Sequence, residues 1–320
     1  MTLETIKSLL TDDIQQNNRE IIKHLESDVV LINQIGHHII RSGGKRLRPL
    51  ITMLSAKALG YSGNQHILAA TIIEFIHTAT LLHDDVVDNS FKRRGKDTAN
   101  ALFGNSASVL TGDFLYSRAF ELMVKLNSMD IMEILSSATN KIAEGEVLQL
   151  MNCHNPEVTE TNYFDVIYCK TAKLFEAACH IASVISDYPD HQIMIDYGKN
   201  LGIAFQLADD VLDYTASADE LGKNLGDDLA EGKPTLPLIY TKTRADNHAV
   251  ALIDSAIETG AIDQINAITD LIKQYQGVDY TLNHAMVYAQ KAKDALQPLQ
   301  PSPYKEALIS LTELAVNRSS

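Results

Sequence analysis

Residues 64–88 read NQHILAATIIEFIHTATLLHDDVVD and contain neither glycine nor proline. Apolar side chains recur along them at helical spacing, so the stretch predicts one long α-helix. The helix would end in three aspartates, Asp84, Asp85 and Asp88, and the next residues, NSFKRRG, add an arginine pair. A helix that ends in clustered charges of both signs is either a solvated helix terminus or a binding site.

The first aspartate cluster has the chemistry of a metal site. In a helix Asp84 and Asp88 share one face, with about 5–6 Å between their Cβ atoms, and like charges so placed repel each other. Carboxylate oxygens suit hard cations, and Mg²⁺ typically takes one or two carboxylates together with phosphate oxygens and water. The cluster therefore indicates a site for Mg²⁺ and a phosphate group, although a short motif of this kind also occurs by chance.

A second copy of the motif makes chance a poor explanation. Residues 206–214, QLADDVLDY, repeat the arrangement with Asp209, Asp210 and Asp213, again behind apolar residues. Two such clusters could hold several Mg²⁺ ions around one diphosphate and neutralise its charge as it departs. The pair of motifs predicts an enzyme whose leaving group is a diphosphate.

Polar and basic residues occur where such an anion site needs them. His77 lies two helical turns before Asp84, and Gln206 one turn before Asp209, so each shares a face with its cluster. The remaining candidates are Lys45 and Arg48 in RSGGKRLRP (41–49), Arg93 and Arg94, Lys170 and Thr171, and Lys223 and Lys233 in the glycine-rich stretch 220–237. Guanidinium and ammonium groups bind phosphate by charge-assisted hydrogen bonds. The competing interpretation of 41–49 is a helix C-terminus followed by a basic loop.

Composition sets the class of protein. The chain has 320 residues, 45% of them hydrophobic, and a net charge of −14, which argues against a general affinity for nucleic acid or anionic membrane. Three cysteines without metal-ligand spacing predict neither disulfides nor a zinc site. The N-terminus lacks a signal-peptide pattern, and we expect a soluble, cytoplasmic protein without a membrane span.

Hydrophobic periodicity predicts an all-α fold, packed as a single domain over residues 1–320. No convincing strand alternation or hairpin turn is present. The segment 99–126 is apolar nearly all the way round, which indicates a central helix or a subunit interface. Helices are expected at about 3–25, 28–44, 49–60, 64–88, 99–126, 130–151, 160–187, 190–215, 234–243, 247–256, 261–275, 278–296 and 302–317.

These residues resemble a known family. The segments GGKRLRP, HTATLLHDDVVDNSFKRRG, TANALFGNSASVLTGDFL, EGEVLQL, YCKTAKLFEAA, FQLADDVLDY and LGKNLGDDLAEGKPTLPL are similar, in order and spacing, to the trans-type polyprenyl diphosphate synthases. Within that family they are most similar to the bacterial octaprenyl branch. The resemblance spans roughly residues 30–245, and the chain beyond carries no usable signature.

The resemblance implies a helical bundle around a deep cavity, a homodimer, and Mg²⁺-dependent head-to-tail condensation of isopentenyl diphosphate with an allylic diphosphate such as farnesyl diphosphate. The product would pass to a membrane as a quinone side chain. In the family pattern Asp84, Asp88 and Asp209 match the direct metal ligands, and Asp85, Asp210 and Asp213 complete the clusters. Arg93, Lys170, Thr171, Gln206, Lys223 and Lys233 match positions that bind the allylic diphosphate, and Lys45, Arg48, His77 and Arg94 match the isopentenyl diphosphate pocket.

Two other classes of protein share part of this pattern. A class I terpene cyclase also ionises an allylic diphosphate at a DDxxD motif, but it has no second diphosphate to bind and does not need GGKRLRP. A non-catalytic regulatory subunit usually lacks some of the aspartates or lysines, and this chain keeps them all.

The residues before the first cluster predict product length. In the family a bulky aromatic at the fourth or fifth position before the motif stops chain growth early, and here those positions hold Thr80 and Ala79. Growth would then continue along the helix until large side chains of a neighbouring helix, such as Met123, close the cavity. We therefore expect an octaprenyl product of about forty carbons, with nonaprenyl as the nearest alternative.

Overall fold

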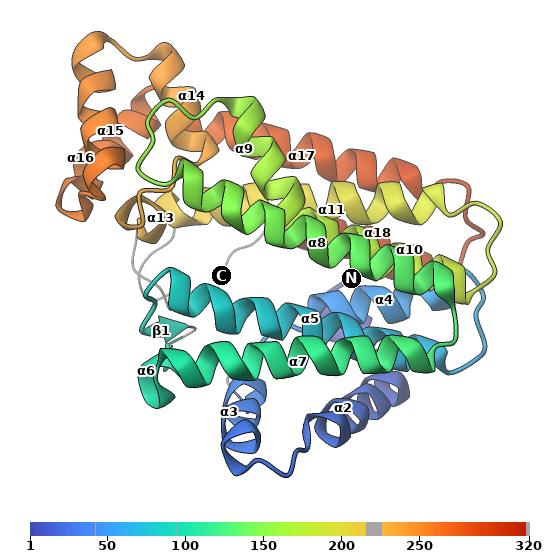
Figure 1. Cartoon of the computed structure of the whole chain (residues 1–320). Helices are drawn as coiled ribbons and strands as arrows, with labels where there is room; N and C mark the ends of the chain where they lie inside the picture. The colour runs from blue at the N-terminus through green and yellow to red at the C-terminus, as the bar shows by residue number, and fades with distance from the viewer. Residues whose placement is uncertain (42, 94, 216–225, 318–320) are drawn as a thin grey trace. The chain divides into compact units, whose positions relative to one another are not determined.

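The computed structural model describes residues 1–41, 43–93, 95–215 and 226–317, and almost all of its regular structure is α-helical (Figure 1). This confirms the predicted all-α class. The chain forms two compact units, one of residues 1–139, 174–198 and 295–311, the other of residues 140–173, 199–294 and 312–320. Every boundary between the units falls within a helix, and the expectation of a single domain stays a prediction.

The first unit is built mainly from helices of the N-terminal part of the chain. They are α1 (Leu3–Ser8), α2 (Thr11–Leu25), α3 (Val30–Arg41), α4 (Leu47–Ala58), α5 (Gln65–Val87), α6 (Ala99–Phe103), α7 (Asn105–Lys125) and most of α10 (Lys173–Ile185). Three further helices are divided between the units within their length: α8 (Met129–Asn152), α11 (Gln192–Thr215) and α18 (Pro303–Val316).

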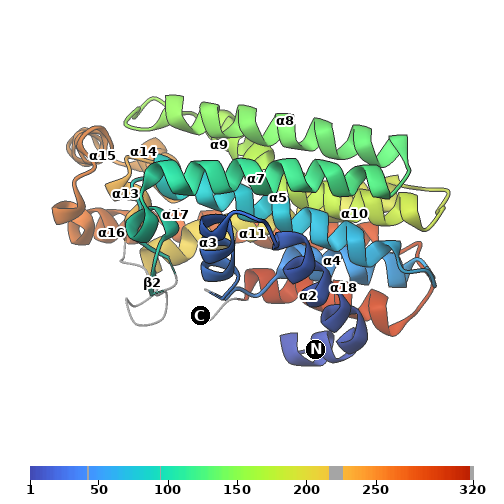
Figure 2. The ribbon, with the colours of Figure 1, turned by 60° about the horizontal axis from the view of Figure 1, so that its bottom comes forward.

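The long apolar helix α5 lies beside α7, as Figures 1 and 2 both show. The Ser108 hydroxyl of α7 donates to the Leu82 carbonyl of α5 at 2.9 Å. Gly112 allows the close approach, because a Cβ there would lie 2.3 Å from Nε2 of His83. These contacts hold the C-terminal end of α5, which carries the first aspartate cluster, against α7.

Three details of the secondary structure predicted for residues 1–126 were wrong. The segment 3–25 is two helices, because Leu10 leaves the helical conformation and the bend buries both Ile6 and Leu10. The segment 99–126 breaks at Gly104, whose φ of 85° is strongly disfavoured for other residues. A short hairpin also exists: β1 (Lys92–Arg93) pairs with β2 (Lys96–Asp97) in antiparallel register.

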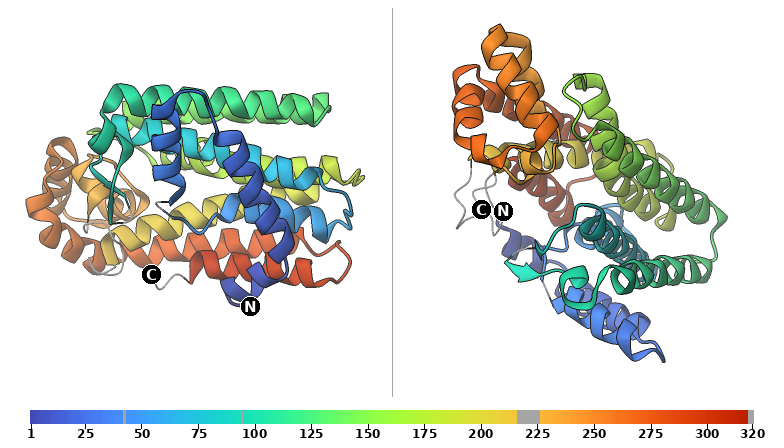
Figure 3. Two further views of the ribbon diagram at one scale, coloured as in Figure 1. Left: turned by 90° about the horizontal axis from the view of Figure 1, so that it is seen from below. Right: turned by 60° about the vertical axis from the view of Figure 1, so that its left-hand side comes forward.

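The second unit contains one helix with an irregular turn and a group of shorter helices. The elements are α9 (Glu160–Ile167), the π-helical turn η1 (Tyr168–Ala172), α13 (Asp227–Ala230), α14 (Leu236–Arg244), α15 (Asn247–Thr259), the 3₁₀ turn η2 (Ile262–Gln264), α16 (Ile265–Gln274) and α17 (Gly277–Ala295). The helices α14, α15 and α16 lie together, drawn in orange in Figure 3, around a core that includes Ile253, Ile268 and Ile272. Between the helices expected at 190–215 and 234–243 the structure adds α13, and residues 216–225 lie outside the described part of the chain.

Helix α5 is also the one described helix long and apolar enough to cross a membrane, but 67% of its most apolar window is buried inside the protein. Burial of this extent is typical of the core helix of a globular protein.

The three cysteines are free thiols. Burial raises the pKa of the Cys179 thiol to about 12, so it stays protonated and unreactive.

Candidate active site

The first aspartate cluster ends α5. The Asp88 N–H group donates to the Asp84 carbonyl at 2.8 Å, so the backbone is still helical between them and both side chains share one half-buried face. The helix ends directly afterwards at Asn89, whose φ is 51°. Asp85 points the other way and is only 2% exposed. The cluster therefore offers Asp84 and Asp88 on an accessible face and keeps Asp85 inside.

Protein groups already bind Asp85. Arg93 of β1 donates to its Oδ1 from Nε at 2.9 Å and from Nη2 at 2.8 Å. The Asn100 amide donates to the Asp85 and Ser90 carbonyls at 3.0 and 3.1 Å. These bonds fold the hairpin back onto the end of α5. Arg93 was predicted to bind the allylic diphosphate, and in the structure its guanidinium is engaged with Asp85.

Two residues predicted for the isopentenyl diphosphate pocket are in contact. Nη1 of Arg48 lies 3.2 Å from Nε2 of His77, and the guanidinium stacks over the Phe175 ring at 4.5 Å from its centroid. Because arginine only donates, Nε2 of His77 must accept, which places the ring proton on Nδ1. Lys45 is exposed just before α4, and Arg94 lies outside the described residues.

The second aspartate cluster lies near the end of α11. Asp209 is half-buried, whereas Asp213 is 8% exposed. Oδ2 of Asp213 accepts from the Asp228 N–H at 3.2 Å, and its carbonyl accepts from the Gly226 N–H at 3.0 Å. Asp213 thus caps the short helix α13, and Asp209 is the member of this cluster on the more accessible face.

Asp210 is the buried member of the second cluster, at 2% exposure. Its carboxylate accepts from the Tyr163 hydroxyl and from Nε2 of Gln206, the latter at 2.8 Å, while Thr171 donates to Oε1 of Gln206 at 2.9 Å. Burial raises the pKa of Asp210 well above its usual value, and the negative charge of Asp228 raises it further. Burial likewise raises the pKa of Tyr163, so the phenol keeps its proton and donates.

The π-helical turn η1 positions Lys170 and Thr171. Lys170 Nζ donates to Glu146 of α8 at 2.7 Å. Gly145 of α8 faces the turn, where a Cβ would lie 2.7 Å from the Cβ of Cys169 and 2.8 Å from the Lys170 nitrogen. Single π turns inside helices are frequent at functional sites. Here the extra residue per turn displaces Lys170 and Thr171 from ordinary helical register, and Gly145 makes room for it.

In the glycine-rich stretch, the structure describes Lys233 but not Lys223. The Lys233 ammonium donates to Glu231, and its backbone N–H donates to the Asp228 carbonyl at 2.8 Å. Gly232 takes a φ of 65° at this point, and a Cβ there would lie 2.3 Å from Nδ1 of His154.

The residues predicted to control chain length differ in burial. Ala79 and Met123 are fully buried, in α5 and α7 respectively. Thr80 is half-buried, and its hydroxyl donates to the His77 carbonyl at 2.8 Å. Small residues therefore occupy both positions before the first cluster, and Ala79 belongs to the interior.

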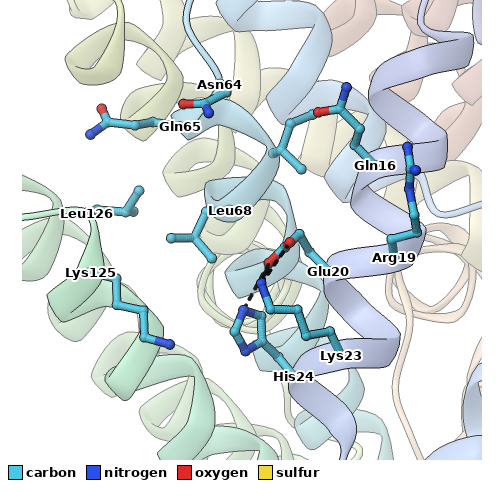
Figure 4. A pocket seen from close by; sticks show the side chains of 11 residues that line it. Gln16, Arg19, Glu20, Lys23, His24, Asn64, Gln65, Leu68, Lys125 and Leu126 are labelled. Atoms are coloured by element: carbon cyan, nitrogen blue, oxygen red, sulfur yellow. Dashed lines mark hydrogen bonds and ion pairs between the residues drawn. The ribbon is translucent and has the colours of Figure 1, made fainter.

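A surface pocket lies elsewhere in the first unit, between α2, the start of α5 and the end of α7 (Figure 4). Among the described residues, its lining includes none of the predicted site residues. Leu68 in the pocket is sixteen residues before Asp84, about 24 Å along a helix. Glu20 also neutralises Lys23 at 3.0 Å. The pocket is therefore separate from the first aspartate cluster.

Sequence reasoning assigned no role to three residues that hold the site together: Glu146 beside Lys170, Asn100 beside Asp85, and Tyr163 beside Asp210. Glu146 and Asn100 occur in the quoted segments EGEVLQL and TANALFGNSASVLTGDFL, so their place in the motifs was a usable signal. Tyr163 precedes Lys170 by two helical turns, and only the hydrogen bond reveals its part.

Comparison with known proteins decides the family. Residues 29–274 match the polyprenyl synthetase family. The chain belongs to this family. It is therefore a prenyltransferase, and the all-α isoprenoid synthase fold and the enzyme class predicted from the motifs are confirmed.

The polyprenyl synthetase relatives match this chain over its full length. Octaprenyl diphosphate synthase of Haemophilus influenzae is 52% identical, covering 100% of this chain and 98% of the relative. That of Escherichia coli is 50% identical, covering 99% of each. The crystal structure of a polyprenyl synthase from Caulobacter crescentus CB15, complexed with calcium and isoprenyl diphosphate, has a TM-score of 0.96 at 44% identity, covering 100% of this chain and 98% of that one. Such relatives identify a trans-prenyltransferase that makes long-chain polyprenyl diphosphates.

Proposed function

We propose that the chain adds isopentenyl diphosphate units head-to-tail to an allylic diphosphate, starting from farnesyl diphosphate and ending at the octaprenyl chain. The observation that carries this proposal is the shared design of the two aspartate clusters. In each, the second aspartate of the DD pair is buried and bound by protein groups, while the first stays on a half-buried face. The names of the Haemophilus influenzae and Escherichia coli relatives support the octaprenyl product.

The residues present fit Mg²⁺. The candidate ligands Asp84, Asp88 and Asp209 supply oxygen atoms alone, which suits a hard cation. Within the described residues, no group of three or more histidine, cysteine, aspartate or glutamate side chains could hold a metal by itself. That matches a cation that takes one or two carboxylates from the protein and completes its coordination with phosphate oxygens and water. When bound, Mg²⁺ would neutralise the charge that develops on the leaving diphosphate.

The chain's own residues bind and orient the substrates. Lys170 and Gln206 donate to the allylic diphosphate, and Lys45, Arg48 and His77 bind isopentenyl diphosphate. Loss of diphosphate leaves an allylic cation, and the double bond of isopentenyl diphosphate attacks it. One proton then leaves the new chain for the released diphosphate. This chemistry needs no protein nucleophile, and exclusion of water protects the cation.

The two diphosphate pockets are separable by mutation. Lys45→Ala and Arg48→Ala each remove charge-assisted hydrogen bonds to one phosphate group. We expect the KM for isopentenyl diphosphate to rise about tenfold or more, with a smaller change for farnesyl diphosphate, since a bond to a charged group contributes about 1.5–3 kcal/mol. Steady-state kinetics with each substrate varied in turn measure the difference. Equal effects on both substrates would contradict separate pockets.

We also propose that two copies of the chain associate through the exposed apolar side chains of α6 and α7. Leu102, Leu110 and Val124 are 51%, 66% and 65% exposed, whereas the opposite face of α7 is buried. Leu110→Glu should shift the sedimentation coefficient from dimer to monomer, because it places a charge in an apolar interface. Ile22→Glu, at a 46% exposed position on α2, is the matched control and should leave the dimer intact. A dimeric Leu110→Glu protein would exclude this face.

Release of diphosphate tests the proposed reaction class. The enzyme should release diphosphate from farnesyl diphosphate at an appreciable rate only when isopentenyl diphosphate is present, because the attacking double bond belongs to the second substrate. A terpene cyclase would release it from farnesyl diphosphate alone.

We place the reaction in the cytoplasm, with the product passed to a membrane as a quinone side chain.

A further inference from the structure

A short chain of hydrogen bonds connects three helical segments of the second unit. It runs from Thr171 in η1 to Gln206 in α11, on to Asp210 one turn later, and ends at Tyr163 in α9. Three of these side chains were predicted from the motifs, and Tyr163 was not. All four belong to the same compact unit.

The direction of each bond in this chain follows from chemistry. Oδ2 of Asp210 accepts from the Tyr163 hydroxyl and Oδ1 accepts from Nε2 of Gln206, so the NH₂ group of Gln206 faces Asp210. The Gln206 oxygen therefore faces Thr171, whose hydroxyl proton is used in that bond. With its proton engaged in this way, Thr171 does not donate to a phosphate, whereas Gln206 keeps one N–H to donate. Both carboxylate oxygens of Asp210 are occupied.

The side chain of Tyr163 is held in place by the residues around it. It is 4% exposed, and its ring packs in a core with Ile203, Leu207 and Leu236. The neighbouring Phe164 ring meets it edge-on, with centroids 5.5 Å apart. The hydroxyl group of Tyr163 lies at the edge of this apolar core, where it donates to Asp210. Replacing Tyr163 by phenylalanine would keep the packing and remove one hydrogen bond.

We propose that Tyr163 is a positioning residue for the second aspartate cluster. It holds Asp210 against Gln206, so that Asp210 stays out of the metal site and Gln206 presents its remaining N–H to the allylic diphosphate. This inference rests on the proposed function. It adds that the second cluster acts through the accessible Asp209 and the amide of Gln206. The orientation of that amide depends on Tyr163, which lies in another helix.

Tyr163→Phe is the direct test, with Tyr280→Phe as matched control. Tyr280 is a half-buried tyrosine of the same unit whose hydroxyl donates to Glu160, at 3.1 and 3.2 Å, rather than to an aspartate of the cluster. Titration calorimetry with Mg²⁺ and inorganic diphosphate measures binding without turnover. We expect Tyr163→Phe to bind about ten- to hundredfold more weakly and to raise the KM for farnesyl diphosphate but not for isopentenyl diphosphate. Tyr280→Phe should match the wild type.

A mutant cycle separates positioning from general stability. If Tyr163 acts through Gln206, adding Tyr163→Phe to Gln206→Ala should cause no further loss of binding. A merely structural role predicts that the two losses add, and this would overturn the proposal, as would unchanged binding in Tyr163→Phe. Should Tyr163→Phe not fold, the same cycle with the isosteric Thr171→Val tests the other end of the chain of bonds. If the wild type itself bound no Mg²⁺ and diphosphate, the proposed function would fail as well.

Discussion

Asp84→Asn and Asp209→Asn should each lower turnover at least about a hundredfold while the protein stays folded, because loss of one preorganised group that stabilises a departing anion has about that effect. The fold should survive because each side chain lies at the half-buried end of a helix beside other carboxylates. Removing one of several like charges does not destabilise the protein in the absence of metal. Circular dichroism measures whether the variants are folded. Single-turnover kinetics at saturating Mg²⁺ measure the loss of turnover.

The control for these variants is Asp130→Asn, an exposed aspartate in the first turn of α8. It removes the same charge at a helix terminus, with an expected effect on stability below about 1 kcal/mol and none on turnover. Near-normal turnover of Asp84→Asn or Asp209→Asn at saturating Mg²⁺ would rule out the metal assignment. A variant that unfolds would instead indicate a structural role for the aspartate.

Ala79→Tyr should shorten the main product from the octaprenyl chain to fifteen or twenty carbons. Ala79 is fully buried, and so are Ile76 and Ile72 one and two turns further from the aspartates. A growing chain that runs along α5 would meet the new ring first. One helical turn rises about 5.4 Å, close to one extended isoprene unit, so the position of a blocking side chain sets the number of additions.

Mass spectrometry of the products measures this shift, and Ala79→Ser is the matched control because it keeps a small side chain. A tyrosine in a packed interior also costs about 1–3 kcal/mol of stability, so the melting temperature should be recorded for both variants. From farnesyl diphosphate, addition of the first isopentenyl diphosphate should persist and give the twenty-carbon product, since the aspartates are unchanged. Full-length product from a folded Ala79→Tyr enzyme would mean that the growing chain does not pass Ala79.

The features of this site that could be predicted from sequence are those that depend on the spacing of residues within one helix or one motif. Periodicity predicted α5 and α11, and the i, i+4 spacing was enough to place Asp84 and Asp88 on one face of the helix. Arg48 and His77 were assigned to one pocket on the resemblance of their motifs, and the structure brings them to 3.2 Å. In each case the signal lay within a few residues of the side chain concerned.

The inward or outward direction of each aspartate could not be predicted, because it depends on partners from other segments. Asp85 is held by Arg93 across a hairpin that shows no strand alternation in the sequence. Asp210 is held by Tyr163, 47 residues earlier in the chain. The π turn at Lys170 was likewise invisible, since its sequence reads as an ordinary helix and the space for it is provided by Gly145 on α8.

The most direct test of the proposed reaction is to size the products that the purified protein makes from farnesyl diphosphate and excess isopentenyl diphosphate with Mg²⁺. We expect a linear all-trans octaprenyl diphosphate of about forty carbons, on the resemblance to the octaprenyl synthases, whose formation stops when a chelator removes the metal. A cyclic hydrocarbon, a product that stops at fifteen or twenty carbons, or synthesis that continues without a divalent metal would contradict the proposed function.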